Sequence, residues 1–167
     1  VLKKSSNRSE KIKILQNCPS CGNKATKENN GAILRCTNTF ACEDQKIGQL
    51  IHFASKKSMN IDGFGEKQIK QMFKLNLIKR FDDIFSLNNN RKTIVKLEGW
   101  GDLSFNNLIN SIEKSKNIDL EKFIFSLGIR FVGETISRLL AKEFISFENF
   151  IKKSNNYERL STIDGLG

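Results

Sequence analysis

The string NIDGFGEKQIKQMF, residues 60–73, joins a Gly-apolar-Gly turn directly to a stretch with the apolar spacing of a helix. In the turn, Gly63 and Gly65 flank Phe64. A glycine can adopt a positive φ, and it lets another molecule approach the backbone without a Cβ in the way. We expect Phe64 to face inward and to hold the turn on a core. The stretch therefore predicts a hairpin that runs into an amphipathic helix.

The same pattern recurs along the chain. Close copies are Leu97–Gly101 and Ile163–Gly167, and a degenerate copy is Ile129–Gly133, where Phe131 stands in place of the first glycine. Successive copies begin 36, 32 and 34 residues apart. A constant period of this length is typical of a repeated supersecondary unit.

A longer repeat surrounds the turns. The segments 81–101 and 147–167 are both 21 residues long and align without a gap, with Phe on Phe, Asn-Asn on Asn-Asn and Gly-x-Gly on Gly-x-Gly. This indicates two pairs of motifs, joined by a helical stretch over 102–126. The last motif is truncated after its hairpin, and the sequence does not begin with Met. We therefore expect the sequence to be a piece of a longer one.

A hairpin at a helix N-terminus presents backbone N–H groups, which form a ready site for an anion. Contacts of this kind follow the phosphates of a nucleic acid without reading its sequence. Alternatively, the glycines are only caps between helices, with no ligand. On the first interpretation, the predicted DNA-binding residues are Gly63, Gly65, Lys67, Gly99, Gly101, Arg130, Gly133, Gly165 and Gly167.

The composition agrees with a nucleic-acid partner. The 167 residues carry a formal net charge of +10, and most of this excess lies in the first 60 residues. A cationic surface favours a polyanion, although abundant Lys can also reflect an AT-rich genome. No run of 18 apolar residues or secretion signal occurs. We therefore expect a cytoplasmic protein with no membrane partner.

All the cysteines lie in one window with the spacing C-x2-C-x14-C-x5-C, at Cys18, Cys21, Cys36 and Cys42. The intervening TKENNGAILRC (26–36) predicts a β-hairpin around an Asn-Gly turn, which would bring the two pairs together. Four thiolates favour structural zinc, with no open position for catalysis. The alternatives are two disulfides, a redox C-x-x-C, or His52 as a rival ligand. We expect His52 to lie instead on a helix over 48–60.

These patterns predict a mainly α fold. A small four-cysteine zinc finger with a short β-hairpin (residues 15–48) is followed by a helical tandem helix–hairpin–helix domain (residues 49–167) that contains the two motif pairs. The Phe residues, as in LEKFIFSLGI, are expected mostly at core positions rather than on a base-stacking surface.

The finger, followed by LIHFASKKSMNIDGFGEK, LEGWG, LGIRFVGE and IDGLG, resembles the bacterial NAD-dependent DNA ligases over essentially the whole chain. The resemblance implies that the four cysteines bind zinc and that the hairpin glycines contact duplex phosphates in the minor groove. It also implies that residues 1–14 are the end of an OB-fold and its linker. Phe131 breaks the glycine pattern in the third hairpin, so we expect a weakened or redirected contact there.

The same resemblance implies an enzyme that seals nicks in duplex DNA during replication and repair, with NAD and magnesium bound outside these residues. No K-x-D-G occurs, so the lysine that the family adenylates is absent and no catalytic residue is assigned. We expect the chain alone to be inactive and monomeric, and to bind nicked double-stranded DNA. The alternatives are a stand-alone DNA-binding module, a part of a nuclease or branch-processing complex, or an interaction protein that does not bind DNA.

Overall fold

The computed structural model describes residues 14–27 and 33–166. The chain divides into two compact units, Val1–Gln45 and Lys46–Gly167, and each is described by itself. In the described ranges, no helix is both long and apolar enough to cross a membrane. The predicted OB-fold end falls almost entirely on residues outside those ranges, as does the predicted Asn-Gly turn.

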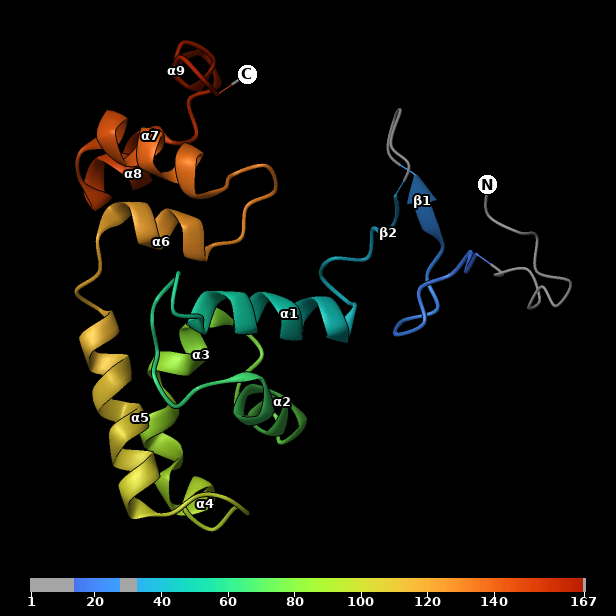
Figure 1. Ribbon diagram of the computed structural model, residues 1–167, viewed down its shortest axis with the longest axis vertical. Coiled ribbons are helices and arrows are strands. Elements are labelled where there is room, and N and C mark those ends of the chain that lie inside the picture. The colour runs from blue at the N-terminus through green and yellow to red at the C-terminus, as the bar shows by residue number, and fades with distance from the viewer. Residues whose placement is uncertain (1–13, 28–32, 167) are drawn as a thin grey trace, which may run out of the picture. The chain divides into compact units, whose positions relative to one another are not determined.

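The first unit is built on a two-stranded antiparallel hairpin, β1 (Ala25–Lys27) and β2 (Leu34–Cys36) (Figure 1). The register sets Ala25 opposite Cys36, and an isolated bridge joins Asn17 to Lys24. This pairing carries the second pair of cysteines to the first, as the spacing predicts. Among the described residues of this unit, Cys42 alone is fully buried. So small an apolar core cannot hold a fold, and such units need a metal or a disulfide.

Helix α1 (Glu43–Ala54) leads from the first unit into the second, with two acidic residues in its first turn. It ends earlier than the predicted helix over 48–60. The chain instead reverses after Ala54, and the N–H groups of Met59 and Ile61 donate to the carbonyls of Phe53 and Ala54 at 3.0 Å each. This tight reversal delivers the chain to the first Gly-apolar-Gly turn.

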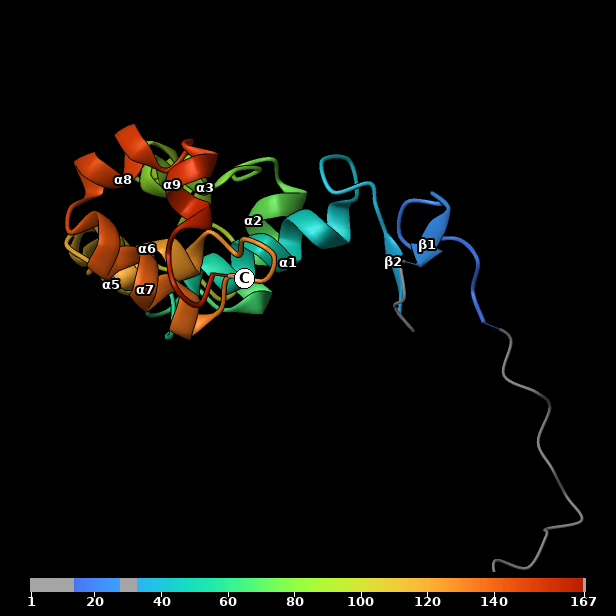
Figure 2. The ribbon, with the colours of Figure 1, turned by 90° about the horizontal axis from the view of Figure 1, so that it is seen from above.

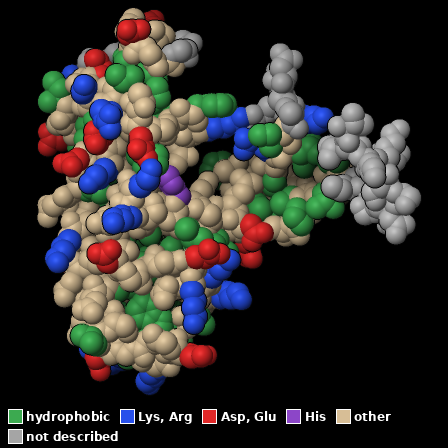
Figure 3. Space-filling model, in the orientation of Figure 1, with side chains coloured by type: hydrophobic (Ala, Val, Ile, Leu, Met, Phe, Trp, Pro, Cys, Tyr) green, Lys and Arg blue, Asp and Glu red, His purple; other side chains and the backbone are tan. Residues whose placement is uncertain are grey.

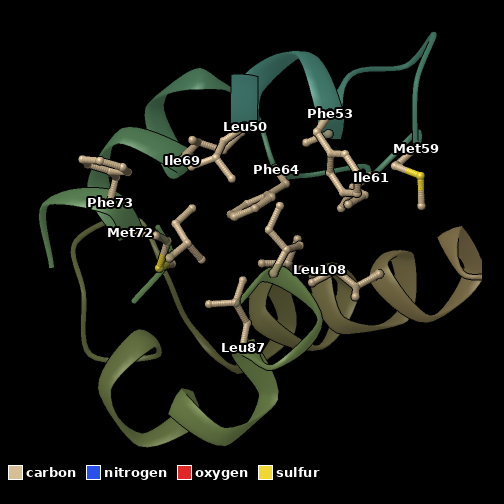
Figure 4. Close-up of a cluster of buried hydrophobic side chains, with 14 of the residues drawn as sticks. Leu50, Phe53, Met59, Ile61, Phe64, Ile69, Met72, Phe73, Leu87 and Leu108 are labelled. Carbon is tan, nitrogen blue, oxygen red and sulfur yellow. The ribbon is translucent and has the colours of Figure 1, made fainter. Parts of the chain in front are cut away.

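The first motif pair surrounds one hydrophobic cluster, shown in Figure 4. Its apolar side chains come from helix positions three or four apart, such as Ile69, Met72 and Phe73, and all three are at most 3% exposed. Phe53 stacks on Phe81 with ring centroids 4.5 Å apart. After α1, the elements around this cluster are α2 (Glu66–Lys74), α3 (Phe81–Phe85), the 3-10 helix η1 (Leu87–Asn90), α4 (Arg91–Ile94) and α5 (Asp102–Ser115).

The second motif pair has its own, smaller cluster of Ile124, Leu140, Phe144 and Phe150. The helices α6, α7 and α8 lie together in both views of the ribbon (Figures 1 and 2). These elements are α6 (Leu120–Ser126), α7 (Glu134–Phe144), α8 (Phe147–Lys153) and α9 (Tyr157–Ser161). Helices α3 and α8 begin at Phe81 and Phe147, which are equivalent positions of the longer repeat.

The connection between the pairs is not one helix. Residues 116–119 lie outside both α5 and α6, and Asp119 adopts an extended backbone at the start of α6. Asn and Asp compete with the helix for backbone hydrogen bonds, which explains a break at Asn117 and Asp119. The predicted fold class is confirmed: the described part of the chain is mainly helical, with a small β-hairpin beside four clustered cysteines.

Candidate nucleic-acid interface and metal centre

The three Gly-apolar-Gly segments and the degenerate copy Ile129–Gly133 adopt the same turn. In each, the N–H of the apolar residue donates to the carbonyl three residues earlier: Phe64 to Ile61, Trp100 to Leu97, Val132 to Ile129 and Leu166 to Ile163, at 3.0–3.3 Å. The third residue of each turn has a positive φ: 76° at Gly63, 80° at Gly99, 65° at Phe131 and 85° at Gly165. A positive φ explains why glycine occupies this position in three of the four copies.

A positive φ does not explain the second glycine of the motif. Gly65, Gly101 and Gly133 precede α2, α5 and α7 with φ of −81°, −165° and −86°, values that any residue adopts. A Cβ added at Gly101 or Gly133 would meet nothing within 4 Å. At Gly65 it would lie 3.5 Å from Gln68 Oε1, an ordinary contact. The chain's own conformation and packing do not require glycine here, and a glycine at such a position is compatible both with a helix cap and with a close approach by another molecule.

The residue between the glycines packs inward, as predicted. Phe64 is buried and belongs to the first hydrophobic cluster, and the half-buried Trp100 packs against the same cluster. Val132 and Leu166 pack in the same way against the second cluster. Each turn is therefore anchored to a core by its middle residue, while the residue before it is exposed in all four turns.

Within the first pair, each hairpin is held by the helix that follows the other hairpin. Gln71 of α2 accepts a bond from Trp100 Nε1 at 2.9 Å and donates to the Glu98 carbonyl at 3.4 Å, and both partners belong to the second hairpin. In return, the N–H of Asp62 in the first hairpin donates to Ser111 Oγ of α5 at 2.7 Å. This exchange fixes the two hairpins with respect to one another.

The second pair repeats part of this arrangement. Leu139 is the sixth residue of α7, as Gln71 is of α2. A Cβ added at Gly165 would lie 3.2 Å from Leu139 Cδ1, so this side chain contacts the fourth hairpin where Gln71 contacts the second. The position of the last predicted contact, Gly167, lies outside the described residues.

Each hairpin helix begins with an acidic residue that is paired with a base. Glu66 pairs with Lys70, and Glu134 pairs with Lys57 at 2.7 Å. The hydrogen bonds from these two lysines lower the pKa of both glutamates. At α5, Asp102 pairs with Arg91. The carboxylates at the helix starts are therefore compensated by cations, although all three pairs are exposed and add little stability.

The two predicted basic contacts both lie at the surface. Lys67 is the second residue of α2, and Arg130 is in the third turn, with its guanidinium 4.3 Å from the Phe131 ring centroid. Among the predicted glycines, the N–H of Gly101 donates to Ser104 Oγ at 2.9 Å. On the face shown in Figure 3, Lys and Arg side chains are interspersed with Asp and Glu. This part of the surface is therefore mixed in charge rather than uniformly basic.

His52 has a structural role away from the cysteines. Its Nε2 lies 2.8 Å from the Phe125 carbonyl, and its ring packs edge-on against the Phe125 ring with centroids 4.9 Å apart. It also lies under Gly128, where an added Cβ would come within 3.3 Å of its Cδ2. His52 thus links α1 to α6 and is not a member of the cysteine cluster.

The four cysteines form one cluster, with all Sγ atoms within 4.8 Å of one another. Cys18 and Cys42 are 3.9 Å apart at Sγ, and Cys21 and Cys36 are 3.5 Å apart. Zn–S bonds of about 2.3 Å in a tetrahedron place sulfurs about 3.8 Å apart, whereas a disulfide needs about 2.05 Å. The cluster fits a tetrahedral zinc ion, and the four thiols are free of disulfides.

Local backbone geometry prepares this cluster. The C-x-x-C loop is closed by a bond from the Gly22 N–H to the Cys18 carbonyl at 2.8 Å, with Gly22 at φ 70°. The Asn38 backbone lowers the pKa of Cys36, but desolvation and the neighbouring thiols Cys21 and Cys18 outweigh it and raise this pKa to about 11. Crowded thiols resist ionisation together, and a cation between them removes that resistance.

Comparison with known proteins shows which family the chain is similar to. Residues 17–43 match the family model of the NAD-dependent DNA ligase C4 zinc finger domain, and residues 122–167 match that of the helix-hairpin-helix motif. A DNA ligase of Pelagibacter ubique is 45% identical over 175 residues, which covers 99% of this chain. The chain is thus similar to DNA ligases over nearly its whole length, and its cysteine region is similar to the zinc finger of the NAD-dependent DNA ligases.

The match covers only part of each ligase. The chain spans 26% of the Pelagibacter ubique protein. DNA ligases of Rickettsia bellii and Wolbachia pipientis are 43% and 42% identical, and each alignment covers 90% of this chain. The alignments cover 24% of the Rickettsia bellii protein and 24% and 23% of two Wolbachia pipientis proteins. The matched zinc-finger region contains all four cysteines, and the matched helix-hairpin-helix region contains the third and fourth hairpins. The chain is thus about a quarter of the length of these relatives.

Several residues of the site were not predicted from the sequence. The reciprocal bonds of Gln71 and Ser111 join residues 27 and 49 positions apart, and no local pattern marks them. The pairing of Lys57 with Glu134 is equally long-range, whereas Glu66 and Lys70 have the i,i+4 spacing that is readable on a helix. Phe131 was noted only as a departure from the glycine pattern.

Proposed function

We propose that this chain holds the sugar-phosphate backbone of duplex DNA around a nick, as the DNA-binding part of an NAD-dependent DNA ligase. The observation that carries the proposal is the glycine that begins α2, α5 and α7. Neither its φ nor its surroundings require it, so its use is to let a phosphate reach the backbone. Three hairpins of one geometry would supply this contact repeatedly.

The chemistry of the contact is general. The N–H groups of the first helical turn have no intrahelical acceptor, and the helix dipole favours an anion at that end. A phosphate oxygen that approaches Gly65 or Gly133 would accept hydrogen bonds from these N–H groups, and Lys67 and Arg130 would add positive charge beside it. Because such contacts carry no base information, the binding would be independent of sequence. Since the hairpins come in two pairs, we propose that the pairs hold phosphates of both strands.

In the first unit, Cys18, Cys21, Cys36 and Cys42 would hold a structural zinc ion. Four sulfur ligands complete the tetrahedron and leave no position for substrate, so the ion would act on the fold alone. It would take the place of the missing apolar core and fix the hairpin β1–β2 to the start of α1. Gln45 of α1, whose Nε2 donates to the Cys36 carbonyl at 2.9 Å, belongs to the same arrangement.

The chemical steps of ligation would be supplied by other parts of the enzyme. We propose that NAD and magnesium bind outside these residues, because the 167 residues contain no Lys-x-Asp-Gly segment for adenylation. Alone, the chain would bind nicks without sealing them. We further propose that it acts as a monomer in the cytoplasm, where a reducing environment keeps the cysteines available for zinc.

The proposal is tested by fluorescence anisotropy with three labelled DNAs of one sequence: a nicked duplex, an intact duplex and a single strand. We expect the nicked duplex to bind most tightly, and log Kd to rise linearly with log salt concentration, since phosphate contacts release counterions. Scrambling the sequence serves as the control and should leave Kd unchanged. Tighter binding of the single strand, or binding that does not depend on salt, would refute the proposal.

A further inference from the structure

The third hairpin differs from the others at both central positions of its turn. Three hairpins carry an acidic residue followed by glycine, and the third carries a base followed by an aromatic residue. The charge of the turn therefore changes sign, and a ring is added where the others have no side chain. The central pairs are Asp62 and Gly63, Glu98 and Gly99, Asp164 and Gly165, and, in the third hairpin, Arg130 and Phe131.

Phe131 occupies a conformation that does not suit it. Its φ is 65°, in the left-handed region where a bulky residue is a true outlier. Its side chain is 83% exposed, so burial in the core does not offset this strain. The half-buried neighbour Val132 supplies the anchor to the core instead. Strained residues of this kind gather at ligand-binding sites, where the strain belongs to the function.

The ring does have one stabilising neighbour. The guanidinium of Arg130 lies 4.3 Å from the centroid of the Phe131 ring, within the range of a cation–π contact. A flat aromatic surface and a cation are thus held side by side in one turn. Gly133, the glycine at the start of α7, lies two residues after Phe131. A phosphate at that glycine would bring the adjoining sugars and base edges to the ring.

We infer that Phe131 is an apolar wedge that packs against the base edges of the bound duplex and partly unstacks one base step from the minor groove. The inference rests on the proposed function, because it assumes that the third hairpin meets DNA. Apolar side chains such as Phe enter the minor groove in this way and kink the duplex. A nick interrupts the stack of one strand, so unstacking there costs less than in an intact duplex. The wedge would therefore contribute to the preference for nicks.

The test replaces Phe131 by Gly, which gives the third hairpin the residue of the other three. The F131G variant should fold at least as well as the parent, because glycine relieves the positive φ. We expect its Kd for nicked duplex to rise about tenfold, since stacking on one base is worth roughly this factor. The dependence of Kd on salt should not change, because no phosphate contact is removed. The variant F131L, which keeps an apolar side chain, should retain most of the affinity.

A matched control exists in the connection between α7 and α8. Ile145 has φ 66° and is 82% exposed, nearly the values of Phe131, but it lies in no hairpin. Replacing Ile145 by Gly should raise stability like F131G and leave DNA binding unchanged. A second readout is 2-aminopurine placed beside the nick, whose fluorescence rises when its base is unstacked. The wild-type chain and I145G should raise it, and F131G should not.

The possible results distinguish failure of the wedge at Phe131 from failure of the proposed function. If the wild-type chain binds nicked duplex with the expected salt dependence and F131G binds equally well or better, the wedge is refuted and the proposed function stands. Equal losses for F131G and I145G would also refute the wedge. If the wild-type chain does not bind duplex DNA, the proposed function fails and the wedge fails with it.

Discussion

Replacing the glycines before the hairpin helices by serine tests whether these glycines contact a ligand or only form turns. We predict that Gly65→Ser and Gly133→Ser leave the free energy of unfolding unchanged or raise it slightly. Both residues have a negative φ, and both have room for a Cβ. Serine is moreover the better N-cap, by a few tenths of a kcal/mol relative to glycine. On stability alone, the substitutions are therefore neutral or favourable.

Their effect on DNA binding should be large. A Cβ and a hydroxyl at the helix start would keep a phosphate from reaching the backbone N–H groups. A hydrogen bond to a charged group contributes about 1.5–3 kcal/mol. Losing one such contact raises Kd by a factor of about 10 to 150. Anisotropy titrations of a nicked duplex measure Kd, and urea unfolding of the same samples measures stability.

Gly48 provides the control, because it lies on the exposed face of α1 and an added Cβ would meet nothing within 4 Å. Gly48→Ser should raise stability by about 0.5 kcal/mol, as serine exceeds glycine in helix propensity. It should leave Kd unchanged. If Gly65→Ser and Gly133→Ser bind DNA as tightly as the wild-type chain, the hairpins are only turns between helices, and the interpretation of their glycines is wrong.

Three further predictions concern the folded chain. Gly63→Ala should lower the free energy of unfolding by about 1–2 kcal/mol, because it forces alanine into a positive φ without any clash. Gly165→Ala should lower it further, since the added Cβ would also press on Leu139 Cδ1 at 3.2 Å. Thermal unfolding compares the two variants. Ile69→Ala should cost about 2–5 kcal/mol in urea unfolding, because Ile69 is fully buried in the first cluster. Zinc chelation should make residues 17–43 sensitive to protease. The helical circular dichroism signal should largely remain, since neither hydrophobic cluster includes a cysteine. Loss of the whole helical signal would contradict this prediction.

The sequence predicted those parts of the fold that depend on local rules. The apolar period identified the helices, the glycine pattern identified the turns, and the cysteine spacing identified the cluster. Each of these signals lies within a few residues of the structure it specifies. The outcome at Phe64 shows this well: a single apolar residue between two glycines was predicted to face inward, and it is 3% exposed.

The parts that the sequence did not predict depend on contacts between distant residues. The end of α1 at Ala54 is set by a chain reversal that closes onto Phe53 and Ala54, although the helical spacing continues beyond. The role of His52 depends on the Phe125 carbonyl, 73 positions away. Both require knowledge of which elements pack together, and one sequence does not contain that information in a readable form.

The charges at the hairpins bear on how a phosphate would be selected. The carboxylates of Glu66, Asp102 and Glu134 stand at the helix starts, where they would repel a phosphate by about 1 kcal/mol at 4 Å in water. Their paired cations largely cancel this field. The remaining attraction comes from the helix dipole and from Lys67 and Arg130, and it would act on any nearby phosphate whatever its exact position.

The selection of a phosphate would then depend on the geometry of the hairpins rather than on net charge. A rigid turn that offers N–H groups through a glycine accepts only a phosphate that arrives at the right distance and angle, and the reciprocal bonds of Gln71 and Ser111 fix the spacing of two such turns. A regular duplex presents phosphates at fixed spacing, whereas a flexible single strand must lose conformational entropy to match it. If the hairpins bind DNA as proposed, this rigidity would give a preference for duplex DNA, so Gln71→Ala should weaken binding to the duplex more than binding to the single strand. Equal losses for both DNAs would show that the spacing of the hairpins is not what selects the duplex.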